Sequence, residues 1–149
     1  MIFEQLKAKG LVEVVAADLH RANPLMARAQ KDLKTAQAIV GSDAEWAYVV
    51  AAHAISRAAR ALALAEGVRP RGRDQARTLL QMACCLVGEE DASMVEDLYQ
   101  VRKKGQQFLE SADRPISLYE LESTLNVAEQ LVGAAAKRVY AKDAQTRLL

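Results

Sequence analysis

The sequence predicts an all-α protein, folded as an antiparallel up-down bundle of about five principal helices. Alanine, the residue with the highest helix propensity, is abundant, whereas the 149 residues include only 7 glycines and 3 prolines. Aromatic residues make up 5% of the chain, so a sheet would have few of its favoured side chains. Apolar residues also recur at helical spacing along most of the sequence. This length suits one domain.

The first 22 residues are helical in character but are interrupted at Gly10, so one or two short helices are expected to pack on the bundle. The bundle itself is predicted over residues 23–140. Its first helix is expected to begin at Asn23-Pro24, because asparagine is a good N-cap and proline is tolerated at the first helical position. Gly41 is expected to end this helix.

The second helix is predicted from Asp43, its N-cap, to Glu66, and Gly67 stops it. A stripe of alanines along one face would let a neighbouring helix approach closely. Residues 67–73 hold two glycines and a proline and are predicted to form a loop. No strand is predicted anywhere in the chain.

Three further helices complete the predicted bundle. The first covers about 74–87 and the second about 91–111. The last begins at Ser117, where a Ser-x-x-Glu pattern matches a capping box. Residues 141–149 are expected to form a frayed tail.

Composition and motifs exclude several classes of function. The net charge of +1 gives no overall attraction to nucleic acid or membranes. The N-terminus does not resemble a signal peptide, and no apolar run reaches the ~20 residues of a membrane helix, so a cytoplasmic protein with no membrane contact is expected. Cys84 and Cys85 are expected to be small apolar side chains in the core. No metal-ligand spacing, phosphate loop or dinucleotide motif is present, so no metal or cofactor is predicted.

Four arginines within nine residues form the first candidate site. Such a cluster could bind an anion or an acidic partner, or could simply be a solvated loop. No aromatic residue is interleaved with them, so base stacking is not indicated. The cluster consists of Arg69, Arg71, Arg73 and Arg77.

The second candidate site is a helix face. Arg102, Gln106 and Glu110 follow one another at a spacing of four residues and therefore form one row. His53 and Arg57 lie near the middle of the alanine-rich helix and could join this row at a groove. The alternative is a solvated helix edge, with His53 partly buried and hydrogen-bonded.

Parts of the sequence resemble the HEPN family of bacterial and archaeal helical-bundle proteins. The resemblance lies in AYVVAAHA at 47–54 with EGVRPRG at 66–72, in VRKKGQQFLE at 101–110, and in the closing helix at 117–136. It covers roughly residues 23–140. It implies an antiparallel bundle that commonly dimerises. Many members are ribonucleases of toxin–antitoxin or defence systems, and others accompany a minimal nucleotidyltransferase.

The resemblance also implies where catalysis would occur. Active members carry an arginine, usually a polar residue next, and a histidine four to six residues later. Here Gly105, Gln106 and Glu110 occupy these places, and no histidine follows His53. If Arg102 were the motif arginine instead, its histidine would be due at 107–109, where none stands. Cleavage needs a cation and a proton carrier near the phosphate, so the resemblance predicts a protein without ribonuclease chemistry.

Three functions follow as hypotheses. The leading one is a non-catalytic HEPN-like homodimer that binds a nucleotidyltransferase-type or toxin–antitoxin partner, or a nucleotide or RNA. The second is a ribonuclease with an altered site, in which His53, Arg57, Arg102 and Glu110 would have to converge. The third is a helical adaptor with no nucleotide role.

Overall fold

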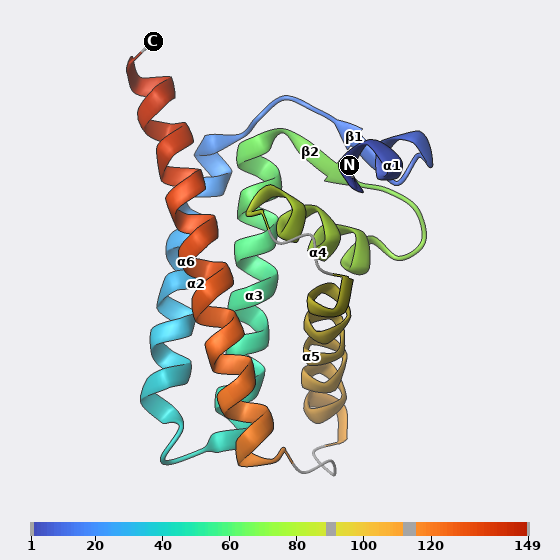
Figure 1. Cartoon of the computed structure of the whole chain (residues 1–149). Coiled ribbons are helices and arrows are strands. Elements are labelled where there is room, and N and C mark those ends of the chain that lie inside the picture. Colours follow the sequence, from blue (N-terminus) through green and yellow to red (C-terminus); the bar gives the residue numbers. More distant parts are fainter. Residues whose placement is uncertain (1, 89–91, 112–115, 149) are drawn as a thin grey trace.

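The computed structural model describes residues 2–88, 92–111 and 116–148 and is almost entirely helical (Figure 1). The prediction of an all-α protein is therefore confirmed, and the helices α2 to α6 are the five principal ones. The elements are α1 (Ile2–Ala8), β1 (Val12–Val14), α2 (Leu19–Ile39), α3 (Ala44–Glu66), β2 (Val68–Pro70), α4 (Gln75–Leu86), α5 (Ala92–Ser111) and α6 (Leu118–Leu148).

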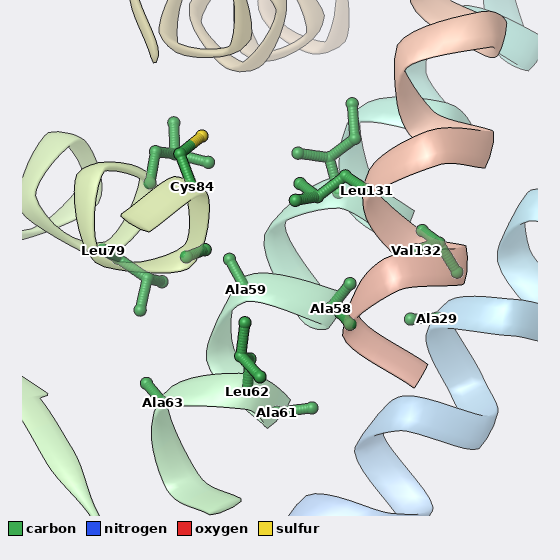
Figure 2. Packing of buried hydrophobic residues seen from close by; sticks show 14 of the residues in the cluster. Ala29, Ala58, Ala59, Ala61, Leu62, Ala63, Leu79, Cys84, Leu131 and Val132 are labelled. Carbon is green, nitrogen blue, oxygen red and sulfur yellow. The ribbon is translucent and has the colours of Figure 1, made fainter. Parts of the chain in front are cut away.

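Helix α3 is the centre of the molecule. The long helices α2, α3 and α6 lie side by side, α4 lies across one end of α3, and α5 stands beside it (Figure 1). The alanine stripe of α3 makes this close packing possible, because Ala54, Ala58 and Ala61 are fully buried. Figure 2 shows Ala58 facing Ala29 of α2 and Val132 of α6. The core thus surrounds most of α3 and leaves a narrow exposed strip, which contains His53 and Arg60.

Helix ends follow the predicted caps at three places. Asp43 accepts a hydrogen bond from the backbone N–H of Trp46 at 3.0 Å, and Gly67 ends α3 with a φ of +70°. Asp74, at the predicted start of its helix, also caps α4 through the N–H of Arg77, although no cap was predicted there. At α6, the N–H of Glu120 donates to the Ser117 hydroxyl at 3.1 Å, and the Ser117 N–H donates to Glu120 at 3.3 Å. This reciprocal pair is the predicted capping box.

The predicted start of the first long helix is wrong. Helix α2 begins at Leu19, and its cap is Asp18, which accepts from the N–H of Arg21 at 3.1 Å. Pro24 lies inside the helix, where its missing N–H costs one bond close to the N-terminus. Asn23 caps nothing; its Oδ1 is buried without a hydrogen-bond partner among the described residues. The predicted division at residue 22/23 therefore falls within a continuous helix.

Two short strands were not predicted. β1 pairs antiparallel with β2, with Val14 opposite Val68 and Glu13 opposite Arg69. Each strand has three residues, too few for an alternating pattern to stand out. The strand β1 takes the place of a second short N-terminal helix, and β2 lies within the predicted loop.

The C-terminal prediction also differs from the structure, because α6 remains helical through Leu148 instead of fraying after Tyr140. The Tyr140 hydroxyl donates to Gln30 of α2 at 2.7 Å, which ties this part of α6 to the bundle. Residues 91 and 149, which bound two of the predicted segments, lie outside the described residues.

The thiols and the helix lengths complete the description. Cys84 is buried and Cys85 is half-buried, and neither forms a disulfide bond with a described residue. Within the described part of the chain, no helix combines the length and apolar character needed to cross a membrane.

Candidate functional site

A hollow of about 170 Å³ lies where the exposed strip of α3 meets α5. Helix α3 contributes His53, Ser56 and Arg60, and α5 contributes Arg102 and Gln106. Three of the five residues predicted for the binding face, His53, Arg102 and Gln106, are thus brought together. The two helices place them by their periodicity, since positions three, four and seven residues apart share one helix face.

Gly105 sets how closely α5 approaches α3. A Cβ at this position would lie 3.3 Å from the Cβ of Ala52 and 4.0 Å from the Cα of Val49. The missing side chain therefore has a packing reason. Its neighbours Arg102 and Gln106 are carried to the rim of the hollow by this contact.

Two further hollows adjoin the first. One of about 190 Å³ shares Ser56, Arg60 and Arg102 with it and extends to Gln75 of α4. The other, of about 570 Å³, lies on the α2 side of Arg60. We call the surface of these three hollows the α3 face. The basic and imidazole side chains on it are His20, Arg21, Arg28, His53, Arg60 and Arg102.

The charged side chains that line the α3 face are all basic. None of the described residues that line its three hollows is an aspartate or a glutamate. Arg60 has no carboxylate partner in the described part of the chain, and Arg102 only donates to the Gln106 side-chain oxygen, at 3.5 Å. Two guanidinium groups are therefore available to an anion, with Ser56 and His53 beside them as neutral hydrogen-bonding groups.

Two residues that were predicted for the binding face do not line these hollows. Arg57 forms an ion pair with Asp32 of α2, whose carboxylate is buried and is also bound by Arg28 at 3.0 Å. Glu110 is exposed and does not line any of the three hollows. His53, Arg57, Arg102 and Glu110 therefore do not converge, which counts against the altered ribonuclease site.

Most arginines of the cluster after α3 already form ion pairs with carboxylates of the protein. Arg69 and Arg71 bind Glu13 of β1, with nitrogen–oxygen distances of 2.8 and 2.6 Å, and these bonds lower the pKa of Glu13. Arg77 binds Glu96 and Asp74 and lies 4.0 Å above the ring of Tyr99. Of the four, only Arg73 has no such partner among the described residues. The cluster therefore joins β1, β2, α4 and α5 to one another and leaves little charge for a ligand.

No family model, curated protein or solved structure matches the chain. The HEPN resemblance therefore remains a prediction from sequence phrases and helix lengths. The chemistry of the α3 face is then the basis for inferring what the chain binds.

Sequence reasoning missed Arg60 and Ser56. A signal for Arg60 was present, because it lies seven residues after His53 and so returns to the same face after two turns. No signal could have shown that Arg60 lacks a carboxylate partner, since partners come from other helices. The basic character of the face depends on the packing of α2, α3 and α5 together.

Proposed function

We propose that the chain is a non-catalytic, HEPN-like binding protein that forms a homodimer and binds a phosphate-bearing ligand, such as a nucleotide, on its α3 face. A nucleotidyltransferase-type protein or a toxin–antitoxin component would be its partner. The observation that carries the proposal is the pair Arg60 and Arg102. They come from different helices, share two hollows, and meet no carboxylate there.

Phosphate suits this pair because a guanidinium group presents several N–H donors in a planar fork that matches phosphate oxygens. Each hydrogen bond to a charged group contributes about 1.5–3 kcal/mol. Arg102 is half-buried and Arg60 is exposed, so a ligand that bridges them would reach from solvent into the hollow. His53 and Ser56 can add neutral hydrogen bonds to the same phosphate or to the group next to it.

Binding without cleavage is favoured by the three positions that the resemblance assigns to catalysis. Gly105 packs against Ala52 and has no cation to offer. Gln106 can neither supply nor take up a proton at neutral pH. Glu110 lies outside the hollows and would repel a phosphate.

The test is the affinity for a fluorescent ATP analogue, measured by anisotropy at fixed ionic strength because phosphate contacts are screened by salt. The double variant Arg60→Ala/Arg102→Ala should weaken binding at least about tenfold, the loss expected for one charged hydrogen bond. Arg69→Ala/Arg71→Ala removes the same number of positive charges from the paired cluster and should leave the affinity nearly unchanged.

Three results would contradict the proposal. Equal weakening in the two double variants would mean that only net charge matters. No binding by the unmodified protein, together with a monomer in sedimentation across a wide concentration range, would favour the helical adaptor. RNA degradation by the purified protein that Arg102→Ala abolishes would restore the ribonuclease hypothesis.

A further inference from the structure

A second concave site lies between α5 and α6. Helix α5 packs on α3 and α4, and α6 packs on α2 and α3, while α5 and α6 make little direct contact with each other. Between them is a slot of about 540 Å³ whose floor includes Tyr48 and Val101. The arrangement can be followed in Figure 1, where α5 and α6 flank the lower half of α3. This volume falls within the range of small-molecule sites, roughly 300–1,000 Å³.

One ion pair crosses the slot, and the floor of the slot is neutral. Tyr48 and Thr124 are buried, and burial raises the pKa of Tyr48 to about 12, so this floor is uncharged. Lys104 of α5 forms an ion pair with Glu120 of α6, and Glu120 is itself fixed by the N–H of Ser117. The walls are therefore preorganised, which lowers the cost of binding.

Five side chains with unused hydrogen-bonding groups line the slot. They are one carboxylate, one ammonium, one amide and two hydroxyls, so their formal charges cancel. None of them has a side-chain hydrogen bond or ion pair to another described residue. They are Asp97, Lys103, Gln107, Tyr119 and Ser123.

We propose that this slot binds a neutral polyhydroxylated ring, either a free sugar or the ribose of a nucleoside. A sugar hydroxyl both donates and accepts, which matches the mixture of donors and acceptors on the walls. Tyr119 is 79% exposed and offers an aromatic face for the ring. The two carboxylates of the slot, Asp97 and Glu120, are matched by the two ammonium groups of Lys103 and Lys104, so the slot has no net attraction for a phosphate. It differs in this from the α3 face and does not depend on it.

The test is a titration of isotope-labelled protein with D-glucose, D-ribose and adenosine, and with glucose 6-phosphate and glycine as charged comparisons, followed by amide chemical shifts. Shifts are expected within residues 97–107 and 119–124. The variant Gln107→Ala/Ser123→Ala should raise the dissociation constant about tenfold, as expected for one or two lost hydrogen bonds. Its matched control, Gln37→Ala/Thr35→Ala, removes an amide and a hydroxyl from the exposed side of α2 and should change nothing.

The choice of ligands also distinguishes a site for free sugars from a site for nucleosides. Shifts with the monosaccharides would assign the slot to free sugars, and shifts with adenosine alone would assign it to nucleosides. Binding of only glucose 6-phosphate or only glycine would overturn the proposal, because it would show a preference for an anion or a zwitterion. No shift with any neutral ring, or shifts that Gln107→Ala/Ser123→Ala leaves intact, would overturn it as well.

Discussion

Two arginine-rich regions of this chain carry similar charge but use it differently. In the segment after α3, Arg69, Arg71 and Arg77 each bind a carboxylate and connect elements of the fold. On the α3 face, Arg60 and Arg102 meet no carboxylate in the described part of the chain. The denser cluster is therefore the poorer candidate for a ligand. The density of charge along a sequence does not show how much of that charge is free.

The difference arises from long-range pairing. Glu13, which binds Arg69 and Arg71, precedes them by 56 and 58 residues, and the strand pairing of β1 with β2 brings them together. Glu96 reaches Arg77 from 19 residues away. Because exposed ion pairs contribute little stability, the value of these contacts lies more in orienting β1 and α4 than in energy.

The largest effect is expected from Gly67→Ala, which changes the backbone between α3 and β2, just before the segment that holds Arg69 and Arg71. Gly67 has a φ of +70°, and an added Cβ would lie 2.5 Å from the carbonyl oxygen of Val15. Strain and collision together should lower the free energy of unfolding by about 3 kcal/mol. For a chain of this size that corresponds to a melting temperature about 10 °C lower. Thermal unfolding followed by circular dichroism would measure it.

Gly10→Ala is the matched control for this change. Gly10 also has a φ of +70°, but nothing lies within 4 Å of the position of its Cβ. It should therefore show the backbone strain alone, about 1–2 kcal/mol. If the two variants lose equal stability, the close contact at Val15 contributes nothing and the stated reason is wrong.

A smaller effect with two readouts is expected from Asp32→Ala. This buried carboxylate binds Arg57 and Arg28, whose side chains remain 39% and 55% exposed and can be solvated once it is removed. The free energy of unfolding should fall by about 1–3 kcal/mol. Of the two released guanidinium groups, that of Arg28 is on the α3 face and that of Arg57 lies one helical turn before Arg60. Binding of the fluorescent ATP analogue should therefore tighten about threefold or more.

Glu122→Ala controls for the change in net charge, because Glu122 is exposed on α6. Tighter binding in both variants by the same factor would show a general charge effect. Weaker binding after Asp32→Ala would show that paired and unpaired arginines do not differ as described.

The smallest effect concerns how the ion pairs of Glu13 with Arg69 and Arg71 make the free energy of unfolding depend on pH. Bonds from Arg69 and then Arg71 hold the pKa of Glu13 below its ordinary value of 4.5. A lowered pKa in the folded state gives stability that is present above the unfolded value and is lost as the pH falls through the folded value. Glu13→Gln should therefore be less stable than the unmodified protein at neutral pH. The difference should shrink as the pH falls below 4.5 and vanish once the pH is below the lowered pKa of Glu13. Urea unfolding at several pH values would measure it, and a constant difference would contradict the assignment.

Much of the fold could be predicted because helix ends have local signals. The caps at Asp43 and Ser117 and the stop at Gly67 depend on residues within one turn of the helix end. The start of α2 could not be predicted as well, since Asp18 and the pair Asn23-Pro24 both carry an N-terminal signal. The strands β1 and β2 were missed because their pairing depends on contacts between distant segments.

The site was predicted only in part for a related reason. Periodicity correctly placed Arg102 and Gln106 on one face of α5 and His53 toward it. It could not show that Arg57 turns to Asp32 on α2, or that Gly105 brings α5 against α3. Which arginines remain free is decided by packing between helices, and this information is not local in the sequence.

Helix α5 forms a wall of both concave sites. Arg102 and Gln106 point to the hollow beside α3, and the adjacent Lys103 and Gln107 line the slot beside α6. If a molecule in one opening shifts α5, the width of the other opening changes with it. Thermodynamic reciprocity then requires that each occupant change the affinity of the other by the same factor. Because α5 is shared, measuring the affinity of one opening with the other filled would show whether the two are coupled.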